Sequence, residues 1–269
     1  MADSSASALT SQLTDVWDSL ADLGRTLTDE DWQRETPCPG WPVSAQYAHM
    51  IGTESMLLGR DNPKVDAGRP EHVRNDIGGF NEVWVVALAG SSREEVLAQF
   101  AEVTEARKQA LAQMDEDSFS APSWTPVGQA DYRRFMQIRV FDCWVHQQDI
   151  RDGVGRPGHE SGPVAEQSVD EIVRALGFIV GKKAGAPADA SVRFVLTGPV
   201  SRTIDVAVVD GRARVVDTLD GPPTVTFEME SPVFTRLACG RLAPSAASFS
   251  MSGDEDLGRR VIDSLAFTI

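Results

Sequence analysis

The spacing of apolar residues changes near residue 185, and this change constrains the fold more than any other feature. Before it, apolar residues recur every three or four positions, which is the period of an amphipathic helix. The segment from Ser5 shows this best, with an apolar face of Leu9, Leu13, Val16, Leu20, Leu23 and Leu27. After residue 185 the period falls towards two, as in strands that bury one face. We therefore predict a helical domain over residues 1–184 and a smaller α+β domain over residues 185–269, joined by the GAPADA segment at 185–190.

The first domain contains five predicted helices. The first starts at Ser5, and the others cover about 43–60, 92–115, 129–151 and 164–181. Ser92 and Glu95 have the spacing of a helix-capping box. A rigid, proline-rich loop at 36–42 precedes the second helix, since prolines fix φ and restrict the residues before them. A stretch rich in Gly, Pro, Asn and Asp follows that helix up to about Gly78.

The second domain alternates short strands with two short helices. Strands are predicted at 192–196, 204–208, 213–216, 224–228 and 246–251, and helices at 232–239 and from Asp254 to about Leu265. Asp210-Gly211 is a strong hairpin signal between two of the strands. This order of elements favours an antiparallel α+β layer.

Composition excludes several classes of partner. The formal net charge is −15, which opposes binding to nucleic acid or to an anionic membrane surface. No stretch approaches the roughly 18–20 apolar residues that a membrane span needs. The three cysteines are far apart and odd in number, and the first residues lack the pattern of a secretory signal. We therefore expect a cytoplasmic protein with reduced thiols and leave its oligomeric state open.

The fourth predicted helix carries polar groups where its apolar stripe should continue. Phe135, Ile138, Val145, Asp142, His146 and Asp149 share about a third of its circumference. Asp142 and His146 are four residues apart, so they lie one turn apart on the same face. Polar groups that face a core are costly unless they are paired or bind a metal. A carboxylate and an imidazole at this spacing can hold zinc, and a third ligand from another helix would complete a site with one open position.

His49 is the other histidine placed on a predicted helix. His72 and His159 fall in polar or turn segments, whereas His49 lies among small residues on the less apolar side of its helix. A hydrogen-bonded pair at a helix interface would explain Asp142 and His146 equally well. A core histidine with satisfied hydrogen bonds would explain His49. Spacing alone leaves these interpretations open.

Four motifs resemble the mycothiol-dependent maleylpyruvate isomerase family of actinobacteria. They are TPCPGWPV at 36–43, between Trp32 and His49, then VHQQDIR at 145–151, LACGR at 237–241 and GDEDLG at 253–258. The resemblance covers nearly the whole chain. It implies a DinB-like four-helix bundle at the N-terminus, followed by a sterol-carrier-like α+β domain.

The resemblance also implies a metal site in the bundle. Members of the family hold zinc with a histidine on the second helix and a Glu-x-x-x-His pair on the fourth, and these positions match His49, Asp142 and His146. The chain departs from the pattern at Asp142, which stands where the family has Glu. Because Asp is shorter by one methylene, the metal must lie nearer the helix, or Asp149 or a water must contribute. Asp149 is otherwise expected to orient a ligand imidazole.

The function implied by the resemblance uses zinc, or another divalent metal, and mycothiol as a thiol cosubstrate. Metal coordination lowers the pKa of a thiol, and the thiolate is the nucleophile. An isomerase adds the thiolate to a conjugated double bond, allows rotation about that bond and then eliminates the thiolate. A transferase instead stops after the thiolate has added to a small electrophile or displaced a group from it. An anionic substrate needs a cation, for which Arg241 and Arg139 are candidates, although a solvated or helix-capping role explains each more simply.

A non-enzymatic role is the alternative. In that case the chain is a paralogue that binds a small ligand or a protein, and the polar trio is structural. We expect two further residues to serve packing. Cys38 has no predicted base near it, and Trp41 is expected in the core.

Overall fold

The computed structural model describes residues 2–268, which form two compact units. The first unit contains residues 3–159, and the second contains residues 160–268 together with Ala2. The sequence predicts a division near residue 184, which would leave the fifth predicted helix with the bundle. The structure groups that helix with the sheet, because a Cβ at its Gly177 would lie only 2.7 Å from the carbonyl oxygen of Ala213 in the sheet.

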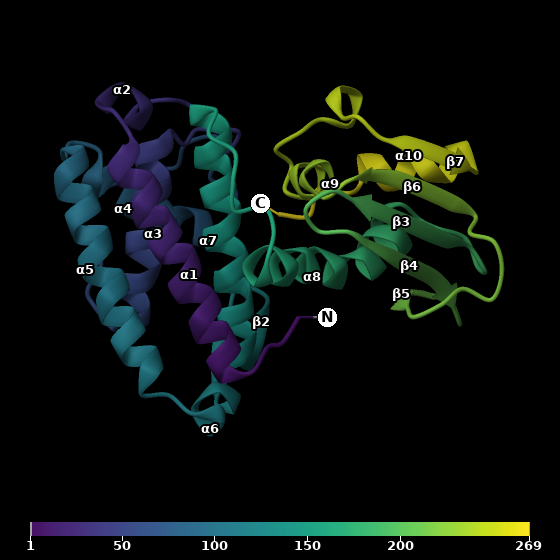
Figure 1. Cartoon of the computed structure of the whole chain (residues 1–269), viewed down its shortest axis with the longest axis horizontal. Helices are drawn as coiled ribbons and strands as arrows, with labels where there is room; N and C mark the ends of the chain where they lie inside the picture. Colours follow the sequence, from purple (N-terminus) through teal and green to yellow (C-terminus); the bar gives the residue numbers. More distant parts are fainter. Residues whose placement is uncertain (1, 269) are drawn as a thin grey trace. The chain divides into compact units, whose positions relative to one another are not determined.

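The first unit is predominantly helical. Its elements are α1 (Ala6–Thr26), α2 (Asp29–Trp32), α3 (Val43–Leu57), α4 (Asp76–Leu88), α5 (Arg93–Ala112), α6 (Glu116–Ser120), β1 (Pro122–Thr125), β2 (Gly128–Asp131) and α7 (Tyr132–Val154). Helices α1, α3, α5 and α7 form the bundle (Figure 1). In it, α1 packs against α5 and α7, and α3 packs against the same two helices. This confirms the predicted four-helix bundle.

Local signals explain the ends of the long helices. The Ser5 side chain accepts a hydrogen bond from the Ala8 N–H at the start of α1. Ser92 and Glu95 form the predicted capping box at the start of α5. The apolar stripe of α1 that begins at Leu9 is buried, as its spacing predicts.

Two elements of the first unit differ from the sequence interpretation. The segment 76–88 forms α4, to which no helix was assigned, and the Asn75 side chain caps it by accepting from the Gly78 N–H. The helix predicted to start near Gln129 begins instead at Tyr132. The preceding residues pair as β2 with β1, so they cannot join the helix.

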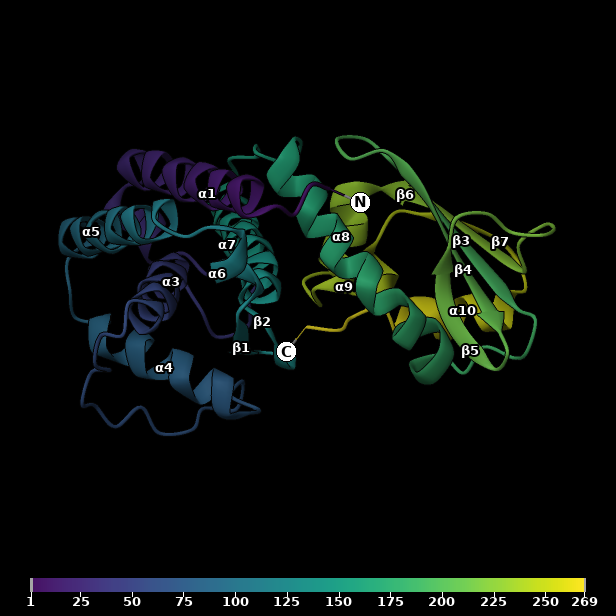
Figure 2. The same ribbon diagram turned by 90° about the horizontal axis from the view of Figure 1, so that it is seen from below.

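The second unit is an α+β layer. Its elements are α8 (Pro163–Phe178), a π-helical turn (Ile179–Lys183), β3 (Ser191–Thr197), β4 (Arg202–Val209), β5 (Arg212–Val216), β6 (Val225–Glu230), α9 (Ser231–Ala238), a 3-10 turn (Pro244–Ala246), β7 (Ser250–Gly253) and α10 (Glu255–Asp263). The strand order is β5-β4-β3-β6-β7. Helices α8, α9 and α10 pack against the sheet (Figure 2).

The sheet is mixed rather than wholly antiparallel. Strands β3 and β6 pair in parallel, with Phe194 opposite Phe227, while the other neighbours are antiparallel. The predicted hairpin is present: Asp210 and Gly211 have φ values of 52° and 72°, and the type I′ turn of a two-residue hairpin requires positive φ at both central residues. The last strand begins at Ser250, later than predicted, because a 3-10 turn occupies Pro244–Ala246. No helix among residues 2–268 is long and apolar enough to cross a membrane.

Candidate metal centre

Two helices of the first unit bring the three predicted ligands together. Helix α3 supplies His49, and α7 supplies Asp142 and His146. Both ends of α7 are fixed locally: the Asp131 side chain accepts from the Arg134 N–H at its start, and Gly155 adopts a φ of 65° at its end. The candidate ligands therefore come from the middle of two packed helices rather than from loops.

The ligand atoms of these residues converge. Nε2 of His49 lies 3.0 Å from Oδ2 of Asp142, and Nε2 of His146 lies 3.5 Å from Oδ1 of the same carboxylate. The two imidazole ring centroids are 4.7 Å apart. One possible ligand atom from each residue lies within 4.8 Å of the other two. The structure thus brings His49 together with Asp142, which lies 93 residues later in the chain, and with His146.

Asp142 is the exposed edge of this buried group. Its side chain is 29% exposed, against 4% for His49 and 9% for His146. Burial lowers the pKa of His49, although Asp142 counteracts this. Burial also opposes a charge on His146, but Asp142 and Asp149 together raise its pKa. Burial alone would raise the pKa of Asp142, yet His49, Arg139 and His146 hold that pKa well below its ordinary value, so Asp142 is a carboxylate at neutral pH.

A buried network of charges holds Asp142 in place. The guanidinium of Arg139 donates to Asp142 and also to Oε1 of Glu54, at 3.0 Å from Nε and 2.7 Å from Nη2. The other oxygen of Glu54 accepts from Nε of Arg107 at 2.9 Å. Arg139 was one candidate for holding an anionic substrate, with a solvated or helix-capping role as the simpler alternative; the structure shows it buried and paired with Glu54 and Asp142. In this position it orients Asp142.

Arg241 lies in the second unit, where its Nη1 donates to the carbonyl oxygen of Cys239 at 3.1 Å. Its suggested role towards an anionic substrate stays a prediction.

Trp41 packs against both candidate histidines. Its ring centroid lies 5.2 Å from that of His49 and 5.6 Å from that of His146. The indole N–H donates to Oε2 of Glu82 at 3.2 Å, and Nε2 of His72 lies 3.0 Å from the same oxygen. Trp41 is buried, as expected, and it also forms a wall of the site.

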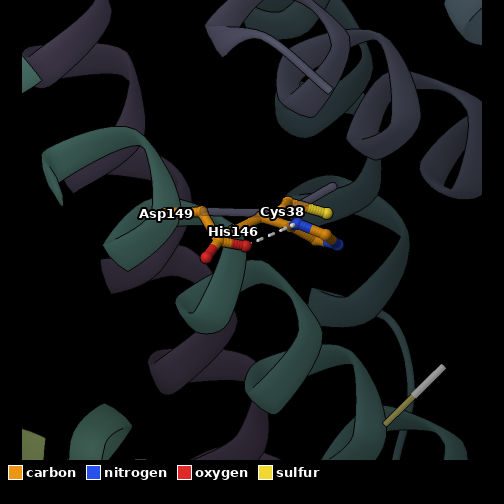
Figure 3. A group of neighbouring side chains, drawn as sticks. All are labelled: Cys38, His146 and Asp149. Carbon is orange, nitrogen blue, oxygen red and sulfur yellow. Dashed lines mark ion pairs between the residues drawn. The ribbon is translucent and has the colours of Figure 1, made fainter. Parts of the chain in front are cut away.

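Asp149 and Cys38 lie on another side of His146 (Figure 3). Oδ2 of Asp149 is 3.6 Å from Nδ1 of His146, and its side chain is 3% exposed. This position agrees with the orienting role expected for Asp149, which stays a prediction. The expectation that Cys38 has no base near it is wrong. The structure brings its sulfur within 4.8 Å of ligand atoms of both His146 and Asp149, because the loop before α3 places it against α7.

Comparison with models of protein families shows which family the chain belongs to. The profile of the mycothiol maleylpyruvate isomerase N-terminal domain matches residues 13–151, and that of the C-terminal domain of the same family matches residues 166–260. The chain belongs to the mycothiol maleylpyruvate isomerase family. It is therefore a member of a family of enzymes, as its motifs predicted. No curated protein matches the chain.

Solved structures agree with this assignment at the level of the fold. The mycothiol-dependent maleylpyruvate isomerase superposes with a TM-score of 0.57 at 13% sequence identity, covering 91% of this chain and 92% of the other. A substituted variant of that enzyme gives a TM-score of 0.56 with the same identity and coverage. At this low identity the likeness establishes the fold that the chain shares with the family.

Sequence reasoning missed two members of the buried charge network, Glu54 and Arg107. One signal was present in the sequence. Arg107 lies in the apolar stripe of α5, four residues after Val103 and four before Leu111, and both of these are buried. A charge inside such a stripe requires a buried partner, because an unpaired buried charge is strongly unfavourable. A search for that partner would have led to an acidic residue on a neighbouring helix.

Proposed function

We propose that this protein is a metal-dependent, mycothiol-using isomerase of a small electrophile, with zinc or another divalent ion held by His49, Asp142 and His146. The observation that carries the proposal is the convergence of these three side chains on one point of the bundle, in a member of the mycothiol maleylpyruvate isomerase family. A transferase with the same thiol is the variant that stops after addition or displacement. We expect the enzyme to act in the cytoplasm, and all three cysteines lack disulfides.

The residues fit a divalent metal. Two imidazoles and a carboxylate form a donor set that zinc uses when one coordination position stays open. Nε2 of each histidine is the ring nitrogen directed at the Asp142 carboxylate, so each ring places one nitrogen at the point where the three side chains converge. The shorter side chain of Asp142 still reaches both histidines, at 3.0 Å and 3.5 Å. This supports Asp as a working substitute for the Glu of the family.

Each surrounding group has a proposed role. When bound, a divalent metal would lower the pKa of a thiol and supply a thiolate at neutral pH. Asp142 stays ionised because its pKa is depressed, and Arg139 fixes the direction of its carboxylate. Trp41 covers both imidazoles and excludes water from that side. The exposed edge at Asp142 is the side from which a thiol and a substrate reach the site.

The proposed isomerisation regenerates the thiol. The sulfur forms a bond to one carbon of a conjugated double bond, and the electron pair of that bond moves onto the conjugated carbonyl group. The former double bond is then single and rotates. The electron pair returns, the carbon–sulfur bond breaks, and the double bond re-forms in the other geometry. A transferase would consume one thiol per turnover instead.

An assay with maleylpyruvate and a panel of small electrophiles tests this proposal. The purified, zinc-loaded protein should turn over at least one of them only when mycothiol is present, and loss of free thiol distinguishes transfer from isomerisation. His146→Ala should abolish turnover, whereas His159→Asn should retain it. His159 is a matched control because its backbone has a φ of 56°, which Asn tolerates. Absence of thiol-dependent turnover across the panel would contradict the proposal and favour a binding role.

A further inference from the structure

A second group of possible metal ligands shares His146 with the first group. Cys38, His146 and Asp149 each place one such atom within 4.8 Å of the other two. Figure 3 shows the sulfur of Cys38 beside the imidazole, with the Asp149 carboxylate facing the same ring. We propose that these three residues form a second metal-binding group. It takes a thiophilic divalent ion such as Zn²⁺ or Cd²⁺, and it competes with His49 and Asp142 for His146.

The imidazole of His146 faces both groups. Its Nε2 lies 3.5 Å from Asp142, and its Nδ1 lies 3.6 Å from Asp149. Nδ1 is buried and makes no hydrogen bond to any residue of the described chain. A neutral imidazole has one unprotonated nitrogen, so His146 can serve only one group at a time. Because a different ring nitrogen is directed to each carboxylate, the ring does not have to turn over to change groups.

The separations suit a single ion. Ligands of one tetrahedral zinc lie roughly 3.3–3.8 Å from one another, since zinc bonds nitrogen, oxygen and sulfur at about 2.0–2.3 Å. The atoms of Cys38, His146 and Asp149 are already within 4.8 Å. The proposal requires side-chain rotations that close the remaining difference.

Hydrogen bonds hold the loop that carries Cys38. The hydroxyl of Thr36 accepts from the Cys38 N–H at 3.2 Å and from Nε2 of Gln46 at 2.8 Å, and it donates to the carbonyl oxygen of Trp41 at 2.7 Å. These three bonds match the one donor and two acceptor positions of a hydroxyl. Gly40 has a φ of 78°, and a Cβ there would lie 2.5 Å from the His72 ring. The loop is therefore a fixed element that holds the thiol against α7.

The two groups differ in the metals that they favour. Imidazole and carboxylate in the first group suit zinc and several other divalent ions, whereas a thiolate favours thiophilic ions over Mg²⁺ or Mn²⁺. Cys38 is the one sulfur ligand in either group. The second group therefore gives a spectroscopic signature that the first group cannot give.

Cobalt titration of the metal-free, reduced full-length protein tests the proposal. The wild-type protein should develop the near-ultraviolet charge-transfer absorption of a cobalt–thiolate bond. Cys38→Ser should lose this absorption, and Asp149→Asn should weaken it. Cys239→Ser, which removes a cysteine of the second unit, should retain it, and His49→Ala should also retain it because it damages the first group alone. Absence of the band in the wild-type protein, or a full band in Cys38→Ser, would overturn the proposal.

A second measurement uses the wild-type protein and does not depend on whether a variant folds. Alkylation of each cysteine is followed by mass spectrometry with and without Cd²⁺. Cadmium should slow the alkylation of Cys38 by about tenfold or more, because a thiolate bound to the metal is not free to act as the nucleophile. An unchanged Cys38 rate at saturating Cd²⁺ would also overturn the proposal. Both readouts are independent of turnover, so failure of the proposed activity does not alter their meaning.

Discussion

Glu54 on α3 accepts two hydrogen bonds from Arg139 on α7, and both side chains are buried. The second oxygen of the same carboxylate accepts from Arg107 on α5. One acidic residue thus joins three helices of the bundle and, through Arg139, fixes Asp142 in the candidate metal centre. Removal of one member of such a network leaves buried charge without compensation.

Glu54→Gln should therefore destabilise the first unit by about 3–5 kcal/mol, because it leaves two buried arginines without their shared carboxylate. Denaturant unfolding followed by tryptophan fluorescence measures this. The matched control is Glu102→Gln, which breaks an exposed pair with Arg60 and should change stability by less than about 1 kcal/mol. Equal effects of the two substitutions would show that the buried network contributes no more than a surface pair.

The ring of Trp41 should contribute more to the stability of the first unit than its indole N–H does. Trp41→Ala removes the contacts with both imidazoles and should destabilise the unit by about 3–5 kcal/mol. Trp41→Phe keeps an aromatic ring and loses the bond to Glu82, which still has His72 as a partner, so we expect a loss of about 1–2 kcal/mol. Thermal and denaturant unfolding compare the two variants. A loss in Trp41→Phe as large as that in Trp41→Ala would assign the main contribution to the hydrogen bond.

Substitutions at Asp142 separate its charge from its length. Asp142→Asn keeps the size but removes the charge, and zinc affinity should fall by at least about tenfold, since even supporting residues have effects of this size. Asp142→Glu restores the residue type of the family and should keep zinc affinity within about tenfold of the wild-type value. Competition with a chromophoric chelator measures both. Loss of zinc from Asp142→Glu, together with retention in Asp142→Asn, would contradict the assigned role.

Asp31, which lies outside the candidate metal centre, should make the stability of the first unit depend on pH. The Thr28 N–H, which donates to Asp31, is the main cause that lowers its pKa, and the Thr28 hydroxyl and Arg156 add to this. A depressed folded-state pKa stabilises the protein above the unfolded value of about 3.9, and this contribution disappears as the pH falls through the folded value.

Asp31→Asn should accordingly destabilise the protein at pH 7 and have a smaller effect near pH 3. Denaturant unfolding at the two pH values provides the comparison. Asp29→Asn removes a carboxylate that is 87% exposed in the same turn, and it should show a smaller difference between the two pH values. An effect of Asp31→Asn that does not change with pH would contradict the assignment.

The two candidate ligands on α7 stand out in the sequence, although spacing alone does not separate a metal site from a hydrogen-bonded pair, whereas His49 does not stand out. His146 and Asp142 interrupt an apolar stripe, and that contrast is visible in one sequence. Helix α3 is buried on nearly all sides and includes buried Gln46, His49 and Glu54, so it has no polar face against which a ligand stands out. His49 was predicted from the family resemblance. Cys38 was missed because its position depends on a loop whose conformation is set by contacts with residues outside it.

Fold features that depend on distant contacts were also missed. The start of α4 contains Gly78 and Gly79, which disfavour a helix. Packing against α3 compensates for this low helix propensity. The Trp84 ring of α4 lies so close to α3 that a Cβ at Gly52 would be 2.5 Å from it. The alternation in β3 and β6 predicted strands, but local alternation does not specify which strands pair or in which direction. Their parallel pairing therefore could not be predicted.

Metal content of the purified protein, measured by elemental analysis together with protein concentration, tests the central claim most directly. We predict about one equivalent of zinc or another divalent metal per chain after purification without chelator, and well under one equivalent in His146→Ala, since two protein ligands rarely retain zinc. His159→Asn should keep the wild-type metal content. A metal-free wild-type protein that also fails to bind added zinc, or a His146→Ala variant with full metal content, would contradict the account.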